Sequence, residues 1–355
     1  MRIPIFTVVL VLLVGGIYSA CRTAPPALPA DLEAHLKDRI PQLMADYHVP
    51  GVSYAVVSAD GILLEGDFGY SDVAKQIPVT PKSVFQAASL GKPLFAYSVL
   101  KHLHPQILDV SKPLAPYLKQ TFAADPAAGR ITGAQFLSHS AGLVYSEEHQ
   151  RREIAFPPGS RWQYSGLGYG VMQQAVEVIA GKPLDLWMKA TVLDPLQMSE
   201  SAFRSPESTI VKGYNRQGEE TDTQRWSYPN AGSSLNCTAA DYGRFISQTL
   251  RELVRTGERG PSPTMFREAV TVDSALGLSW GLGWALAGAD GKSYFLHWGS
   301  NPGFKSLAIG SVEGNLGLVI LTNGDNGLEL ATALVPLVFG KRLPFLDFYM
   351  LHPDD

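Results

Sequence analysis

A serine and a lysine three residues apart are the first residues in this chain whose types and spacing could do chemistry. They lie in Ser89-Leu90-Gly91-Lys92, and residues three apart share a helix face, so the amine can reach the hydroxyl. A serine hydroxyl needs a base, and lysine can serve only if burial or nearby charge lowers its pKa from about 10.4. Pro93 suits a first helical turn, whose positive end would face an oxyanion. The pair is a weak signal alone and needs support from the rest of the chain.

The segments that precede this pair predict a helix and a β-hairpin. Apolar residues recur at helical spacing over 32–47, and we expect Pro41 to kink or split that helix. Strand-like runs over 52–57 and 62–68 flank a turn with glycine at position 61, which predicts a hairpin.

The rest of the chain divides into a helical middle and a strand-rich end. From Phe85 onward the pattern changes to helix, and residues 102–270 show few strand signals. Short apolar runs then predict antiparallel strands around 282–286, 294–297, 307–310 and 316–322, with a covering helix over 328–339. The predicted fold is α/β of the α+β kind: an antiparallel sheet built from N- and C-terminal segments and flanked by helices, with an inserted, mostly helical subdomain.

One catalytic domain is expected to occupy most of the chain. We place it at residues 31–345, with 31–101 and 271–345 forming the α/β part, 102–270 the mostly helical part, and 346–355 a tail.

Composition and charge exclude several kinds of protein. The chain has 355 residues, of which 45% are hydrophobic and 17% charged, as in a globular protein with a large core. Lys and Arg number 29 against 33 Asp and Glu, without a basic run, so we expect no nucleic-acid partner. His102 and His104 are too close to chelate like an i, i+4 pair and have no accompanying thiol cluster, so we expect no metal or other cofactor.

The first residues have the order of a signal peptide. Arg2 precedes an apolar run over 5–14, followed by small residues, and we predict a signal peptide over 1–20, with an uncleaved signal anchor as the alternative. The Pro-rich segment 21–30 predicts a tether between envelope and folded domain.

Cys21 is a candidate for lipidation. Ser19 and Ala20 before it resemble a bacterial lipoprotein processing site, although plain cleavage near Ala20 or Ala24 remains an alternative. A lone buried thiol is the favoured interpretation of Cys237, over a disulfide to Cys21. We expect an exported protein of the bacterial cell envelope, a periplasmic lipoprotein tethered to the membrane, or else a secreted one.

The segments around and after Ser89 resemble, in order, the class C β-lactamase and penicillin-binding-protein-like serine hydrolase family. This resemblance covers nearly the whole mature chain and is carried by residues 88–92 (ASLGK), 136–143 (FLSHSAGL), 158–165 (PGSRWQYS), 231–234 (AGSS), 280–284 (WGLGW), 297–304 (HWGSNPGF) and 321–323 (LTN).

The resemblance assigns Tyr164 as a third catalytic residue with Ser89 and Lys92. The family's Tyr-x-Asn tyrosine lies beside the Ser-x-x-Lys pair, where a phenol can shuttle a proton and act as a base in the field of the lysine. Gly166 departs from the pattern, because the family commonly has an asparagine there that holds the substrate's amide. This departure favours an ester or a small peptide over efficient β-lactam turnover.

The resemblance also assigns substrate-binding roles to His297, Gly299 and Ser300. His297-Trp298-Gly299 takes the place of the family's Lys-Thr-Gly strand motif, in which the glycine lets a substrate approach the backbone. The N–H groups of Ser89 and Ser300 would form the oxyanion hole. His297 would offer a positive charge or a hydrogen bond to a substrate carboxylate, or else would simply pack against Trp298.

A Ser-His-Asp triad is the less favoured arrangement. His139 would be its base, with Asp109 or Asp241 orienting it, but the matching family segment is structural and predicts an internal histidine. We therefore predict an exported serine hydrolase that forms an acyl-enzyme on a small molecule or peptide, as an esterase, amidase or D-amino-acid peptidase. A true β-lactamase and a non-hydrolysing penicillin-binding or sensing envelope protein are the alternatives.

Overall fold

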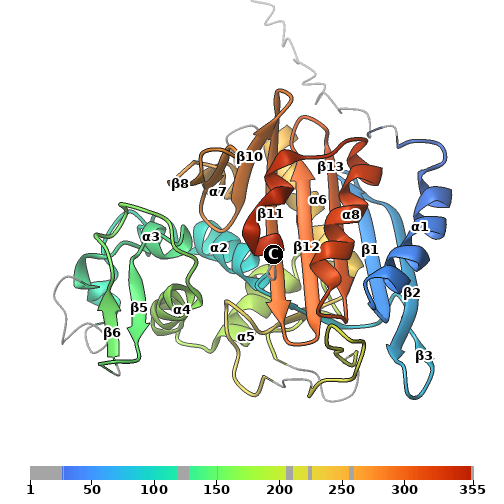
Figure 1. Ribbon diagram of the computed structural model, residues 1–355. Helices are drawn as coiled ribbons and strands as arrows, with labels where there is room; N and C mark the ends of the chain where they lie inside the picture. The colour runs from blue at the N-terminus through green and yellow to red at the C-terminus, as the bar shows by residue number, and fades with distance from the viewer. Residues whose placement is uncertain are drawn as a thin grey trace, which may run out of the picture.

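A nine-stranded antiparallel sheet forms the centre of the protein (Figure 1). The computed structural model describes residues 26, 28–118, 128–149, 151–204, 211–222, 226–255 and 260–352. From one edge to the other, the strands are β3 (Ile77–Pro78), β2 (Gly61–Asp72), β1 (Gly51–Ser58), β13 (Leu316–Thr322), β12 (Phe304–Ser311), β11 (Lys292–Asn301), β10 (Ala285–Ala289), β9 (Leu278–Trp280) and β8 (Val270–Asp273). Because β1 pairs with β13, the sheet is assembled from both ends of the chain, as predicted.

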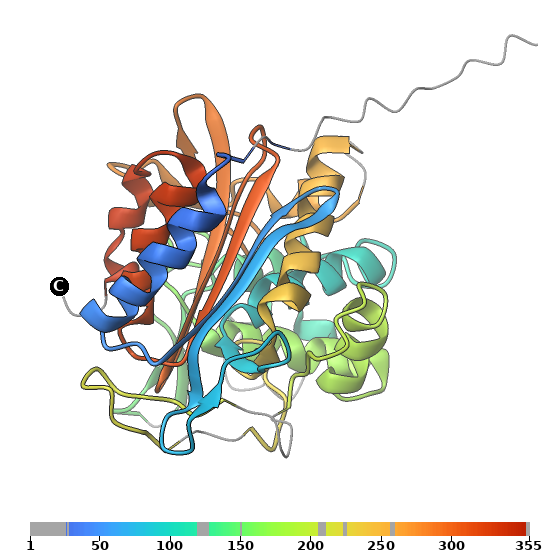
Figure 2. The ribbon, with the colours of Figure 1, turned by 90° about the vertical axis from the view of Figure 1, so that its right-hand side faces the viewer.

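Helices cover both faces of this sheet. Figure 2 shows α1 (Leu32–Asp46) and α8 (Gly327–Phe339) on one face and α6 (Ala239–Arg255) on the other. Side chains alternate along β1 accordingly, so that Val52, Tyr54 and Val56 pack toward α1 and α8 while Ala55 and Val57 pack toward the helical part. The strand reads as a continuous apolar run because both of its faces are buried.

The helical part lies to the side of the sheet in Figure 1 and begins with α2 (Gly91–His102). Its other helices and small sheets are α3 (Gly133–Leu137), β5 (Leu143–Ser146) with β6 (Arg151–Ile154), α4 (Gly166–Ala180), α5 (Leu184–Met188), β4 (Phe85–Ala88) with β7 (Leu235–Cys237), and α7 (Ser262–Met265). Single turns of helix occur at Ala115–Tyr117, Ala128–Arg130, Lys189–Leu193, Pro344–Asp347 and Tyr349–Leu351.

Three local predictions were wrong. The first helix is not split, since α1 continues through Pro41 with Leu36, Ile40 and Leu43 all buried on one side of it. Packing of that stripe outweighs the N–H that proline removes. The segment from Phe85 starts as strand β4, and the helix begins only at Gly91.

The third wrong prediction concerns the short strands. Residues 102–270 are mostly helical as expected and contain only the short strands β5, β6 and β7 among the described residues. The strand expected from 282 instead begins at Ala285, because 282–284 form a bend between β9 and β10, where Gly283 has a φ of 99°. Strands of three or four residues are too short to show an alternating pattern.

The structure describes most of the C-terminal segment but not the first residues of the chain. Leu346, Phe348 and Leu351, which we assigned to a tail, are buried in the core under α1 and α8. The proposed signal peptide and Cys21 lie outside the described residues, whereas Cys237 is a buried free thiol. None of the helices in the described ranges has the length and apolar character to cross a membrane.

Candidate active site

The turn between β4 and α2 presents Ser89 at the start of a buried helix. Ala88 has a φ of 51°, and α2 begins two residues after Ser89, at Gly91. Residues Gly91 to Leu100 of this helix are all buried, whereas Ser89 is partly exposed. A helix that is buried all round is held by its surroundings on every side, so the hydroxyl has a fixed position at an accessible end.

Lys92 lies against Ser89, as the spacing predicts. Its Nζ is 2.8 Å from Ser89 Oγ, and it also donates to the carbonyl of Gly232 at 2.6 Å. The side chain is 1% exposed, and burial lowers the pKa of Lys92 to about 7. A neutral amine is therefore available near neutral pH and can accept the serine proton.

The carbonyl of Gly232 is a third partner that we did not predict. It accepts from Ser89 Oγ at 3.1 Å as well as from Lys92. Asn230 Oδ1 accepts from the Gly232 N–H at 2.8 Å, and Gln173 Oε1 accepts from the N–H of Ala231 at 2.9 Å. The sequence of residues 229–232 indicated a turn. It could not indicate that the carbonyl of Gly232 contacts the site, because a backbone carbonyl has no sequence signature of its own.

Tyr164 completes the group, with its ring between two other rings. It stacks on His139 at 4.3 Å and on Trp298 at 6.0 Å between centroids. Lys92 Nζ lies 4.8 Å from the centre of the ring. Burial raises the pKa of Tyr164; the nearby Ser89 side chain acts in the opposite direction and more weakly, although no hydrogen bond of ordinary geometry joins them. The phenol stays protonated at neutral pH, which fits a proton donor and argues against the expected base.

His297 does not provide the positive charge that we expected for a substrate carboxylate. It faces the interior from β11, is 0% exposed, and its Nδ1 lies 2.7 Å from the carbonyl of Trp298. That carbonyl can only accept, so Nδ1 carries the proton of the neutral ring. Burial, followed by the charge of Lys92, lowers the pKa of His297 to about 3. The histidine is therefore neutral and packs in the interior, and its Nε2 has no hydrogen-bond partner among the described residues. The hydrogen bond that we expected as the alternative to a charge stays a prediction.

Gly299 of β11 lets β4, the strand that precedes Ser89, pack closely against β11. A Cβ atom at this position would lie 2.2 Å from the carbonyl oxygen of Ala87 and 2.3 Å from Ser306 Oγ. The space beside the glycine is thus filled by β4, two residues before Ser89, rather than left for a substrate as we expected. Ser300, which follows, is exposed and pairs with Lys305 on β12.

His139 supports the site but does not form a triad. Its Nδ1 accepts from the N–H of Ser165 at 3.0 Å, and it has a φ of 57°. Asp241 instead accepts from Ser201 Oγ at 2.9 Å and contacts Arg244. The prediction of an internal histidine holds, and its ring fixes the position of the Tyr164 ring.

A pocket of about 410 Å³ adjoins Tyr164. It is lined by uncharged residues, namely Gly142, Leu143, Val144, Tyr145, Gln163, Tyr164, Ser165, Gly166 and Leu167. A Cβ atom added at Gly166 would meet nothing within 4 Å. The missing asparagine therefore leaves open space beside the phenol. No cluster of three or more metal-ligating side chains occurs in the described part of the chain.

A serine–lysine–tyrosine group with a buried lysine, between a helical part and an antiparallel sheet, defines a class of serine hydrolases. Residues 36–339 match the Beta-lactamase family, and the chain belongs to it. The predicted family and fold are thereby confirmed, and so is the assignment of the protein as a serine hydrolase.

Two relatives and one solved structure illustrate the range of this family. The chain is 27% identical over 349 residues to penicillin-binding protein 4 of Amycolatopsis lactamdurans, covering 88% of this chain and 91% of the relative. It is 24% identical over 372 residues to esterase EstB of Burkholderia gladioli, covering 83% and 91%. The octameric penicillin-binding protein homologue from Pyrococcus abyssi, 19% identical, has the same fold, with a TM-score of 0.77 over 90% of this chain and 80% of that one.

Proposed function

We propose that the protein hydrolyses uncharged carboxylic esters through an acyl-enzyme on Ser89. The observation that carries this proposal is the 2.8 Å contact between Ser89 Oγ and the nitrogen of Lys92, whose pKa burial lowers to about 7. A neutral amine in contact with the hydroxyl is the base that a serine nucleophile requires.

The reaction uses the three side chains in turn. As Ser89 Oγ attacks the carbonyl carbon, its proton passes to Lys92, and the oxyanion rests on the N–H groups of Ser89 and Ser300. The Tyr164 phenol gives its proton to the departing alkoxide and regains one from the Lys92 ammonium. Water then attacks the acyl-enzyme, loses a proton to the same groups, and releases the carboxylic acid and Ser89.

The preference for an uncharged substrate follows from the charges around the site. A substrate carboxylate would need a cation, and His297 is buried and held neutral. The pocket beside Tyr164 has no charged side chain in its lining and suits an apolar acyl or alcohol group. β-Lactams and D-alanyl peptides both carry a carboxylate, so they are expected to be poorer substrates.

A substrate panel tests this proposal. Purified protein is incubated with p-nitrophenyl butyrate, a chromogenic cephalosporin and a D-alanyl-D-alanine peptide, with Ser89→Ala as the control. We expect ester hydrolysis that the control lacks, and a transient increase of one acyl group in intact mass. An ester rate equal in wild type and control, without any adduct, contradicts the proposal.

Penicillin binding without fast turnover is the second candidate. The resemblance to a relative named penicillin-binding protein 4 favours it. A long-lived adduct with a fluorescent penicillin, together with no ester hydrolysis, would replace the first candidate with this one.

Export to the cell envelope is a separate proposal. It is supported by the apolar run over 5–14 and by the small residues before Cys21. The intact mass of the mature protein, compared with that of Cys21→Ala, distinguishes a lipidated cysteine from plain cleavage. An unprocessed N-terminus in soluble extract would contradict export.

A further inference from the structure

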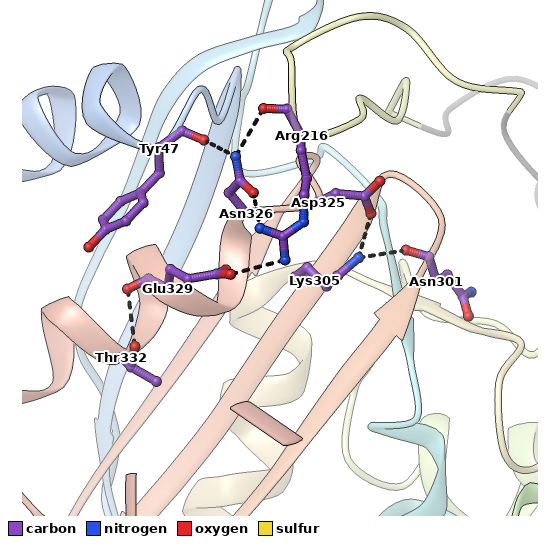
Figure 3. Close-up of polar contacts among 8 residues, drawn as sticks. All are labelled: Tyr47, Arg216, Asn301, Lys305, Asp325, Asn326, Glu329 and Thr332. Atoms are coloured by element: carbon purple, nitrogen blue, oxygen red, sulfur yellow. Dashed lines mark hydrogen bonds and ion pairs between the residues drawn. The ribbon is translucent and has the colours of Figure 1, made fainter. Parts of the chain in front are cut away.

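An ion pair between a buried lysine and a partly exposed aspartate lies at the end of the sheet, beside the turn that follows Ser300. Figure 3 shows Lys305 of β12 reaching both Asp325, just beyond β13, and the carbonyl of Asn301. Lys305 Nζ lies 3.3 Å from that carbonyl oxygen, and Asp325 Oδ1 accepts from the N–H of Gly303 at 2.8 Å. The two charged groups therefore hold both ends of the turn between β11 and β12.

Lys305 itself faces away from the substrate. Leu307 and Ile309, whose side chains point to the same face of β12 as that of Lys305, belong to the core under α1 and α8. The Lys305 side chain itself is 7% exposed. A Cβ added at Gly327, the first residue of α8, would lie 2.9 Å from Lys305 Cβ. Any effect of Lys305 on the reaction must therefore pass through the residues that it holds.

Asn301 links this pair to the face of the sheet on which Ser89 lies. Its carbonyl contacts Lys305, while its side-chain amide donates to Gln86 Oε1 at 2.8 Å and to the carbonyl of Ser233 at 3.2 Å. The side chain is almost fully buried, so these contacts fix the distance between β11 and the two segments that it bonds.

Both partners of the Asn301 amide adjoin the nucleophile. Gln86 lies on β4, three residues before Ser89. Ser233 follows Gly232, whose carbonyl accepts from Lys92 Nζ at 2.6 Å and from Ser89 Oγ at 3.1 Å. A shift of the turn at Asn301 therefore moves the strand that carries the serine and the carbonyl that the serine and lysine share.

We propose that Lys305 and Asp325 are positioning residues for the hydrolysis described above: by fixing the turn from Asn301 to Gly303, they hold Gly232 and β4 so that Ser89 stays in line with Lys92. This inference rests on the proposed function for its kinetic consequence but not for its structural one. A buried ion pair by itself is weak evidence for a stabilising role, whereas directed hydrogen bonds from both charges to one turn specify a geometry.

The other half of the same cluster supplies a matched control. Arg216 donates to Asn326 Oδ1 at 2.7 Å and pairs with Glu329 at 3.2 Å, which joins the segment 211–222 to α8 (Figure 3). Neither of these contacts involves Asn301. Glu329→Gln therefore disturbs a partly buried ion pair in the same place without loosening the turn.

The test compares Asp325→Asn and Lys305→Met with Glu329→Gln and wild type. Because small misplacements of reacting groups cost rate more than binding, we expect kcat for p-nitrophenyl butyrate to fall about tenfold in the first two, with KM within about twofold of wild type. Glu329→Gln should stay within about twofold in both constants. Hydrogen exchange of the backbone amides of 229–236 should quicken in Asp325→Asn and not in Glu329→Gln.

Each outcome decides for or against the inference. Wild-type kcat in Asp325→Asn and Lys305→Met, or an equal loss in Glu329→Gln, overturns it. If Lys305→Met does not fold, Asp325→Asn decides, because asparagine has the size of aspartate and keeps an oxygen that can accept from the N–H of Gly303. If wild type hydrolyses no ester, the proposed function fails, and the exchange rates alone decide whether the pair holds the Gly232 segment.

Discussion

The nitrogen of Lys92 lies 4.8 Å from the centre of the Tyr164 ring, above the face of the phenol. A second ring, that of Tyr169, lies 5.6 Å from the same nitrogen. Ring faces carry partial negative charge and favour an ammonium. Burial of Lys92 disfavours the ammonium and lowers the pKa of Lys92 to about 7. Lys92 can therefore exchange its proton near neutral pH, in contact with the hydroxyl from which we propose that it accepts one.

Activity should follow the deprotonation of Lys92. Only the neutral amine can accept the Ser89 proton, so kcat/KM is expected to rise as the pH passes through about 7 and to level off above it. Initial rates with an uncharged ester at constant ionic strength check this profile. A rate already constant well below that pH would show that a different group is the base.

Stability should also depend on pH through Lys92. Its folded pKa of about 7 lies below the unfolded value, so the unfolded chain binds the extra proton between those values, and stability rises with pH from about 7 to about 10. Near pH 7 the buried amine costs roughly 4 kcal/mol. Lys92→Met is expected to abolish hydrolysis while melting at a temperature that varies less with pH than that of wild type. Thermal melts of wild type and Lys92→Met across this pH range measure the difference. Melting temperatures that change with pH in parallel for the two proteins would contradict the low pKa of Lys92.

Removal of the Tyr164 hydroxyl should slow the reaction without loosening the ring stack. We expect Tyr164→Phe to lower kcat by about 100-fold, a typical loss for a positioned proton donor. Tyr145→Phe, in the lining of the same pocket, is the matched control and should keep its activity. The loss should be smaller for esters whose alcohol is a good leaving group, such as p-nitrophenol, than for alkyl esters. Equal losses for both would argue that the hydroxyl is structural.

The spacing of Ser89 and Lys92 was enough to predict their contact, although Ser89 lies two residues before the start of α2. The N–H of Lys92 donates to the Ser89 carbonyl, so a single turn brings the two side chains to the same side. Tyr164 was placed beside them only by resemblance, since its position depends on ring packing with His139 and Trp298. The sheet built from both chain ends was also predicted, because long buried strands show as apolar runs.

Other features of the site depend on the tertiary fold and have no local signal. The neutral state of His297 follows from its complete burial, which its own strand segment does not reveal. The pairing of Lys305 with Asp325 depends on where β12 begins relative to the end of β13. Likewise, the carbonyl of Gly232 reaches Ser89 only because the turn at 229–232 folds over the start of α2.

Gly299 should be intolerant of even one added carbon. Because a Cβ there would lie 2.2 Å from the Ala87 carbonyl oxygen, Gly299→Ala must push β4 away from β11 and carry Ser89 with it. We expect a loss of about 2 to 3 kcal/mol in the free energy of unfolding and a larger relative loss of kcat. Gly288→Ala on β10, where a Cβ meets nothing within 4 Å, is the control. Denaturant melts and ester kinetics measure the two effects, and similar behaviour of the two variants would contradict the close approach.

Gly166 should set the size of the group that the pocket beside Tyr164 accepts. Since a Cβ at this position meets nothing within 4 Å, Gly166→Asn is expected to fold with wild-type stability while its side chain occupies part of the 410 Å³ pocket. The ratio of kcat/KM for p-nitrophenyl butyrate to that for the acetate should then fall about tenfold, as expected when several buried methylenes lose their space. Gly170→Asn, one turn further along α4 and also without neighbours within 4 Å, leaves the pocket unchanged and serves as the control. An unchanged ratio in Gly166→Asn would place the acyl group elsewhere. A gain in cephalosporin acylation by the same variant would show that the missing amide, rather than the neutral His297, is what limits reaction with β-lactams.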